Sequence, residues 1–238
     1  MTLLSVLVMA IALQPFFEFF QPGNPYQLAA IKQLEDSLPP ETLDPNAEWF
    51  QVWKQSGLTQ KLVVPYFHQL DHPSGRGYRM CFTAAAAMVA AYFGVSDTQE
   101  DYSLTRDQFG DTIYVSSQIE ALRHLGLEAD FRTNGDDALL EAEIASGRPV
   151  LVGIFHRGDI SQGQVPHCDE LGCGHWLVIT GFEKDHWIVN DPMGQLDMER
   201  GGHFSKYGGK GNKLPRAGFR QRWQADGPGT GWVIVVEE

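Results

Sequence analysis

Cys81 immediately precedes a strongly helix-forming segment that contains four consecutive alanines at positions 84–87. Alanine is the best helix former, so residues 81–93 predict a buried helix that ends before Gly94. The N-terminal end of a helix favours an anion and promotes formation of the thiolate, which is the nucleophilic form of cysteine. Cys81 is therefore a candidate nucleophile, although a small cysteine at such a position can equally be a plain core residue.

His175 and Asp191 belong to two apolar segments, 175–182 and 186–191, that flank a polar turn at 183–185. This pattern predicts a β-hairpin. In an antiparallel hairpin the start of the first strand lies beside the end of the second, so both side chains are expected at the same end. A histidine that activates a cysteine needs a hydrogen bond that holds its tautomer, and a carboxylate supplies one. We therefore predict a triad of Cys81 as nucleophile, His175 as base and Asp191 as the group that orients the histidine.

Four segments together resemble the C39-like family of papain-like cysteine peptidases of bacteria and phages. They are Val64-Pro65-Tyr66-Phe67-His68-Gln69, Cys81 with its alanine-rich helix, Gly174-His175-Trp176-Leu177-Val178-Ile179-Thr180-Gly181-Phe182, and Val189-Asn190-Asp191-Pro192. The resemblance covers residues 61–194 and implies that Gln69 helps the backbone N–H of Cys81 to stabilise the oxyanion. It also implies no cofactor and no catalytic metal ion.

The sequence departs from this family pattern in two places. Phe82 follows the cysteine where the family usually has glycine. Twelve positions separate Gln69 from Cys81, so the loop at 71–78 resembles an insertion. Both departures bear on the role of Gln69.

Helical segments precede most of the strand-like ones. Helices are predicted at 81–93, 117–125 and 136–146, and strands at 62–67, 149–155, 175–182, 186–191 and 231–236. This order predicts an α+β fold, not alternating βαβ units. The resemblance implies a papain-like fold in which an N-terminal helical lobe packs on an antiparallel sheet.

Residues 1–58 are expected to form an N-terminal apolar segment and helical appendage, and residues 59–238 the peptidase domain. The apolar run from Leu3 to Leu13 is interrupted by Pro15 and Glu18 before it reaches the length of a membrane span. We expect a helix packed on the protein body. An uncleaved export signal or a membrane anchor is the alternative, so residues 1–20 are a candidate for membrane association.

The formal net charge of −12 argues against nucleic acid as a partner, because such a surface repels phosphates. Residues 200–222 are an exception, with seven basic side chains and no acidic one. This segment is expected to be a solvated, glycine-rich loop, or alternatively a contact surface for an anionic substrate.

Cys168 and Cys173 lie in a short segment, 167–175, that also holds two histidines. Such a cluster resembles a zinc site, but a zinc ion would occupy His175, which the triad needs as its base. A local disulfide, or two thiols that shape the loop before His175, is the preferred interpretation.

The leading hypothesis for function is hydrolysis of an amide bond through a thioester at Cys81. The substrate is expected to be a peptide or peptidoglycan, since residues 223–232 loosely resemble the tails of phage-encoded members. A non-catalytic binding module and an acyl transferase remain alternatives, and the sequence contains no indication of oligomeric state.

Overall fold

The structure is a computed structural model that describes residues 59–167 and 174–238. The chain divides into two compact units, Met1–Asp44 and Pro45–Glu238, and all described residues belong to the second. The predicted N-terminal appendage, its boundary at residue 58 and the candidate membrane segment at 1–20 lie outside the described residues. Within the two described ranges, no helix is long and apolar enough to cross a membrane.

Three α-helices precede most of the strands along the chain. The helices are α4 (Cys81–Tyr92), α5 (Gln99–Arg106), α6 (Val115–His124), α7 (Asp137–Ala145) and α8 (Arg216–Trp223), with short 3-10 turns η2 (Gln69–Asp71), η3 (Gly77–Arg79) and η4 (Ile160–Gln162). The strands are β1 (Gln60–Lys61), β2 (Glu128–Gly135), β3 (Val150–Phe155), β4 (Gly174–Phe182), β5 (His186–Asn190), β6 (Gln195–Leu196), β7 (His203–Ser205), β8 (Asn212–Pro215) and β9 (Gly231–Glu237).

The main sheet is antiparallel, with strand order β2-β9-β3-β4-β5-β8 and β1 paired to β4. The strands β6 and β7 form a separate two-stranded sheet. Strand β4 lies at the centre, between β3 and β5, and its register places His175 opposite Ile154. His175 therefore lies on a strand that is paired with a neighbouring strand on each side.

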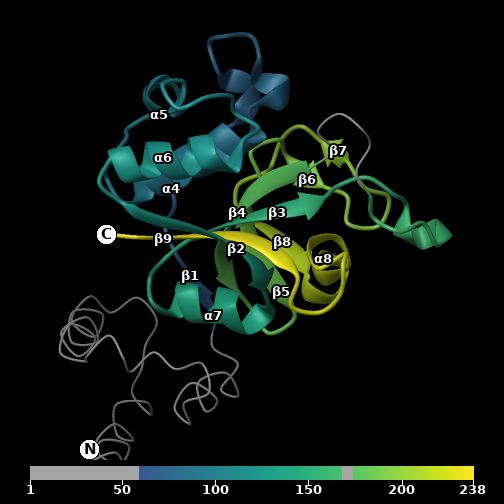
Figure 1. Ribbon diagram of the computed structural model, residues 1–238. Coiled ribbons are helices and arrows are strands. Elements are labelled where there is room, and N and C mark those ends of the chain that lie inside the picture. Colours follow the sequence, from purple (N-terminus) through teal and green to yellow (C-terminus); the bar gives the residue numbers. More distant parts are fainter. Residues whose placement is uncertain (1–58, 168–173) are drawn as a thin grey trace, which may run out of the picture. The chain divides into compact units, whose positions relative to one another are not determined.

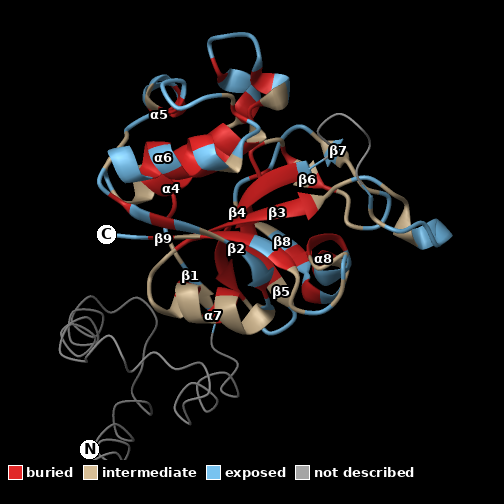
Figure 2. Cartoon of the chain, viewed as in Figure 1, coloured by how far each residue is buried: buried red, intermediate tan, exposed pale blue. Residues whose placement is uncertain are grey.

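Helices cover both faces of this sheet (Figure 1). Trp176 and Val178 of β4 pack with residues of α4 and α6 in one apolar cluster, whereas Leu177 and Ile179 pack with α7 and α8 in another. Successive side chains of a strand point to opposite faces, so a strand buried on both sides is apolar throughout. The burial pattern of β3, β4 and β5 follows this rule (Figure 2). The predicted α+β class, with helices packed on an antiparallel sheet, is confirmed.

Predicted segments 81–93, 117–125 and 136–146 correspond to α4, α6 and α7. The predicted strand at 62–67 is wrong, because pairing ends at Lys61. Pro65 has no N–H for a ladder, and Asn190 Nδ2 instead donates to the Val64 carbonyl at 3.3 Å. Helix α5 was not predicted, although Thr98 caps it by accepting a bond from Asp101 N at 3.1 Å.

The basic segment at 200–222 is not a solvated loop throughout, because it contains β7, β8 and α8. Most of its cations have internal partners. Arg216 and Arg220 pair with acidic residues of α7, Lys213 pairs with Glu183, and Arg222 is fully buried. Most of the positive charges in residues 200–222 thus form contacts within the protein, and these contacts hold α8 and β8 against their neighbours.

Candidate active site

Cys81 is the first residue of α4, and its side chain is partly exposed at the start of that helix. The residue before it, Met80, occupies the N-cap position and provides no side-chain cap. The first N–H groups of a helix have no acceptor within the helix, so this end stabilises negative charge. The His175 side chain and the backbone of Trp176 lie close enough to the Cys81 thiol to lower its pKa. Helix α4 and strand β4 thus meet at this sulfur.

His175 is buried near the start of β4 and lies between two partners. Its Nε2 lies 2.8 Å from Asp191 Oδ1. Because Asp191 occupies Nε2, Nδ1 is the ring nitrogen that is left to interact with Cys81. The hairpin of β4 and β5 therefore brings His175 and Asp191 together, and the packing of α4 on β4 brings Cys81 to the other side of the ring.

Asp191 directly follows β5 and is wholly buried. Its Oδ1 also accepts a bond from Met193 N at 2.8 Å, and its backbone N–H donates to Gly209 O at 2.8 Å. Its Oδ2 lies 3.0 Å from Nε2 of His203. Each carboxylate oxygen therefore has a histidine partner, which fixes the plane of the group.

The three side chains have perturbed pKa values. Burial works against ionisation of Asp191, but His175 and His203 more than offset it and hold the pKa of Asp191 well below its ordinary value. Burial likewise disfavours the charged imidazole, but the charge and hydrogen bond of Asp191 raise the pKa of His175 to about 10. Burial opposes the thiolate, yet the bond to His175 leaves the pKa of Cys81 below its ordinary value. The lowered thiol pKa and the raised imidazole pKa both act in the direction of a thiolate beside an imidazolium.

Gln69 begins η2 and is buried. Its Nε2 donates to Gly77 O at 2.8 Å, its backbone N–H donates to Pro192 O at 2.8 Å, and its Oε1 has no partner among the described residues. Gly77 permits this close approach, because a Cβ there would overlap the backbone of Gln69. The loop at 71–78 thus connects η2 to η3 and folds back on itself. This arrangement connects Gln69 to the segment that leads into Cys81, although Gln69 lies twelve positions before Cys81 in the sequence.

Residues 61–229 match the sequence model of the Peptidase_C39 like family, which is well over half of the chain. The chain belongs to the Peptidase_C39 like family. No curated protein is significantly similar to it in sequence. A protein described as a C39-like peptidase from Bacillus anthracis has a similar structure, with a TM-score of 0.53 and 18% identity over 76% of this chain and 98% of that one. The fold is therefore that of the papain-like C39 peptidases.

Two further structures have a weaker likeness to this C39-like chain. The peptidase domain of Streptococcus ComA, a bi-functional ABC transporter, has a TM-score of 0.44 and 19% identity over 67% of this chain and 91% of that domain. A double-glycine-motif protease from an AMS/PCAT transporter has a TM-score of 0.43 and 19% identity over 75% of this chain and 97% of that one.

His203 is a site residue of this C39-like chain that sequence reasoning missed. It lies in β7, and the ring centroids of His203 and His175 are 4.9 Å apart. His156, at the end of β3, has its ring centroid 5.6 Å from that of His175. The sequence contains no periodic signal for either histidine. His203 reaches the site because the chain after Asp191 returns to the same end of the sheet, whereas His156 directly follows β3, the neighbour of β4.

His175, Asp191 and His203 are also a potential set of metal ligands, since their ligand atoms lie within 4.8 Å of one another. A metal ion there would replace the hydrogen bonds of both histidines to Asp191, and it would occupy the base of the site. The zinc alternative considered from sequence used Cys168 and Cys173, which lie outside the described residues. In this member of the Peptidase_C39 like family, the fold thus brings His175 against the buried Asp191 and next to Cys81 at the start of α4.

Proposed function

We propose that this protein is a cysteine peptidase that hydrolyses peptide bonds with Cys81, His175 and Asp191 as its catalytic triad. The observation that carries the proposal is the position of His175. One ring nitrogen lies 2.8 Å from a buried carboxylate, and the other faces the thiol at the start of α4. A histidine between an oriented carboxylate and a nucleophile is the arrangement that acyl transfer requires.

In the first half-reaction, the Cys81 thiolate attacks the carbonyl carbon of the scissile amide. A carbon–sulfur bond forms and the carbonyl electrons move onto oxygen. When the tetrahedral species collapses, the carbon–nitrogen bond breaks and the His175 imidazolium gives its proton to the leaving amine. The products are a free amine and a thioester on Cys81.

In the second half-reaction, His175 acts as a base and takes a proton from water. The resulting hydroxide equivalent attacks the thioester, and the carbon–sulfur bond breaks. The acid product leaves, and the thiolate and imidazolium are restored. Asp191 stays ionised throughout and keeps the imidazole ring in position through its bond to Nε2.

Gln69 is proposed as an oxyanion donor together with the backbone N–H of Cys81. A primary amide has two N–H groups, and Gln69 uses one of them to reach Gly77 O. The second N–H is then available to a developing oxyanion. Such a donor is commonly worth ~2–4 kcal/mol of transition-state stabilisation.

Peptides are the proposed substrate class, with peptidoglycan as a second candidate. Besides the resemblance of residues 223–232, the sequence argument for an anionic wall polymer was the basic segment at 200–222. Its cations are mostly engaged within the protein, and Lys206 and Lys210 are its exposed members without an ion pair among the described residues. This weakens the peptidoglycan case and leaves peptides as the better-supported class.

The test compares the wild type with Cys81→Ala on a mixed peptide library and on purified bacterial sacculi, with products identified by mass spectrometry. Cleavage of peptides that is lost in the variant supports the proposal. Clearing of sacculi would move the substrate class to peptidoglycan. A product extended by an added amine, in place of an acid, would indicate acyl transfer.

Two results would contradict the proposal. One is peptide cleavage that persists in Cys81→Ala. The other is a wild-type Cys81 that iodoacetamide does not alkylate while neither substrate is cleaved, which is the behaviour expected of a non-catalytic binding module.

A further inference from the structure

A cationic pocket lies beside the start of α4. Its volume is about 200 Å³, and it lies between the η3 turn and the segment that joins α5 to α6. Met80, the residue directly before Cys81, forms part of its wall. The pocket and the proposed nucleophile thus share the same short stretch of chain.

Three guanidinium groups and two carboxylates line this pocket. Arg79 Nη2 pairs with Asp111 Oδ1 at 3.0 Å, and Arg106 Nη1 pairs with Asp107 Oδ1 at 2.7 Å. Three positive charges less two negative charges leave a net charge of +1, which is the charge of Arg76. This excess is local, since the whole chain has a formal charge of −12.

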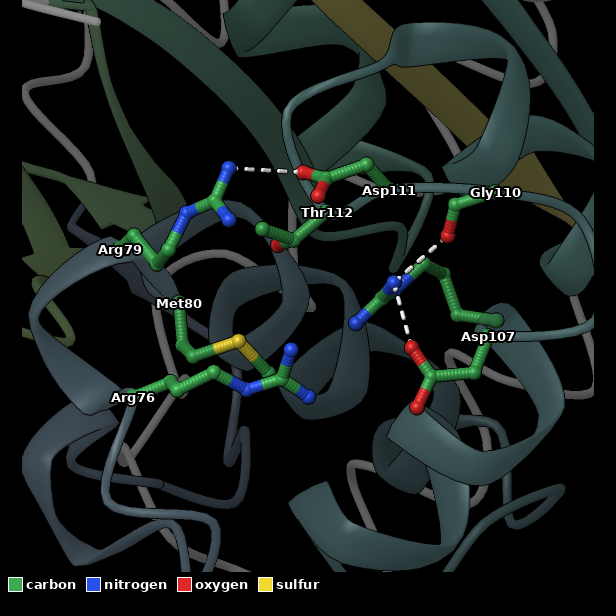
Figure 3. Close-up of a pocket in the computed structure, with 8 residues that line it drawn as sticks. Arg76, Arg79, Met80, Asp107, Gly110, Asp111 and Thr112 are labelled. Atoms are coloured by element: carbon green, nitrogen blue, oxygen red, sulfur yellow. Dashed lines mark hydrogen bonds and ion pairs between the residues drawn. The ribbon is translucent and has the colours of Figure 1, made fainter.

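Arg76 is the cation of the pocket that has no ion-pair partner within 59–167 and 174–238. Figure 3 shows its side chain extending from the loop into the space between Met80 and Asp107. Arg76 is exposed, so its guanidinium can contact a molecule from solvent. A free guanidinium offers a planar fork of N–H donors that matches a carboxylate.

Arg106 adds a second unsatisfied donor. It is 3% exposed, and its Nη1 also donates to Gly110 O at 2.7 Å. Its Nε is buried without an acceptor in the part of the chain that the structure describes. Because this nitrogen is enclosed, a molecule from solvent does not reach it. Arg76 is therefore the group that favours an anionic oxygen ligand in this pocket.

We propose that this pocket binds a carboxylate of the substrate peptide, close to the bond that Cys81 cleaves. The inference rests on the proposed function, because it takes the start of α4 as the site of cleavage. The pocket is large enough for one acidic side chain or one terminal carboxylate. An uncharged amide in its place would leave Arg76 without a partner and would bind more weakly.

The test uses peptides cleaved by the wild type, in which residues flanking the scissile bond are changed between Glu and Gln. A second arm compares free and amidated C-termini, which separates a side-chain carboxylate from a terminal one. The variants are Arg76→Gln and the matched control Arg132→Gln, an arginine of β2 that pairs with Asp130.

We expect the wild type to cleave the preferred acidic peptide with a kcat/KM about tenfold above its neutral counterpart. Arg76→Gln should abolish this preference, mainly through KM, whereas Arg132→Gln should keep it. Added salt should reduce the preference, since an exposed charge pair is screened. Equal cleavage of acidic and neutral peptides by the wild type, with no effect of Arg76→Gln, would overturn the pocket proposal and leave the peptidase proposal intact.

If no peptide is cleaved, the same peptides are tested for binding to Cys81→Ala by fluorescence anisotropy. Preferential binding of acidic peptides that depends on Arg76 would support the pocket although the peptidase proposal had failed. Equal binding of acidic and neutral peptides, or a preference for acidic peptides that Arg76→Gln leaves unchanged, would overturn the pocket proposal.

Discussion

Phe82 and Trp176 stack face to face, with ring centroids 3.9 Å apart and an angle of 2° between the ring planes. Each follows a proposed catalytic residue, since Phe82 comes after Cys81 and Trp176 after His175. Gly153 lies opposite Trp176 in the sheet, and a Cβ at Gly153 would be 3.0 Å from the Trp176 ring. The stack holds the start of α4 against the start of β4. It also accounts for the phenylalanine that stands where the family usually has glycine.

Phe82→Ala should destabilise the protein and reduce the reactivity of Cys81. Removal of a buried phenylalanine costs about 3 kcal/mol or more, and here it also removes the contact that holds the thiol against His175. Urea denaturation gives the change in stability, and iodoacetamide alkylation under native conditions gives the reactivity. Phe93→Ala, at the other end of the same helix, is the control and should leave alkylation of Cys81 unchanged. Unchanged alkylation in Phe82→Ala would show that the stack does not position the thiol.

The pH dependence of Cys81 alkylation should reveal its interaction with His175. The His175 bond lowers the pKa of the thiol against the opposing effect of burial, so alkylation should begin below the pH range of an ordinary thiol. In His175→Gln, burial and the charge of Asp191 still oppose the thiolate and only the Trp176 backbone favours it, so the profile should move to higher pH. A shift of one pKa unit corresponds to a rate about tenfold lower on the acidic limb. Peptide mapping by mass spectrometry assigns the label to Cys81.

His124→Gln, at an exposed position on α6, is the matched control and should follow the wild-type profile. Peptidase activity has its own alkaline limit. Because the pKa of His175 is raised to about 10, the imidazolium that protonates the leaving amine is lost as the pH rises through that value. Identical alkylation profiles for the wild type and His175→Gln would contradict the proposed ion pair.

His203→Ala should move the acidic limb of activity to higher pH. His203 donates to Asp191 Oδ2 and helps to hold the pKa of Asp191 below its ordinary value, against burial. Without that bond the carboxyl group protonates at a higher pH, and once protonated it is a poorer acceptor for His175. His203→Gln retains a donor and should restore part of the wild-type profile. A variant that lost activity equally at every pH would indicate a general structural role for His203 instead.

Arg222→Met should be among the most destabilising substitutions in this chain. Arg222 is fully buried and donates to the carbonyl groups of Phe155, Arg157, Gly158, Met198 and Glu199. Methionine fills similar space but removes the donor to all five carbonyl groups, so we expect a loss of ~3 kcal/mol or more. Arg200→Met, at a mostly exposed side chain, should change stability by less than about 0.5 kcal/mol. Equal urea midpoints for the two variants would contradict this assignment.

The sequence alone identified those parts of the site that depend on local geometry. Alanine propensity indicated α4 with Cys81 at its start, and two apolar segments on either side of a short polar turn indicated the hairpin of β4 and β5. Since the two strands of a hairpin are adjacent in the chain, the encounter of His175 with Asp191 could be anticipated from spacing alone.

Contacts between distant segments were decided only by the tertiary structure. Cys81 and His175 are 94 positions apart, and they meet because α4 packs on one particular face of β4. The second histidine on Asp191, and the lack of an ion pair for Arg76 among the described residues, depend in the same way on how loops fold. Composition fixes how many charges a segment has, but burial and packing select their partners. For this reason the basic segment at 200–222, which its sequence predicts to be a solvated loop, contains the buried Arg222.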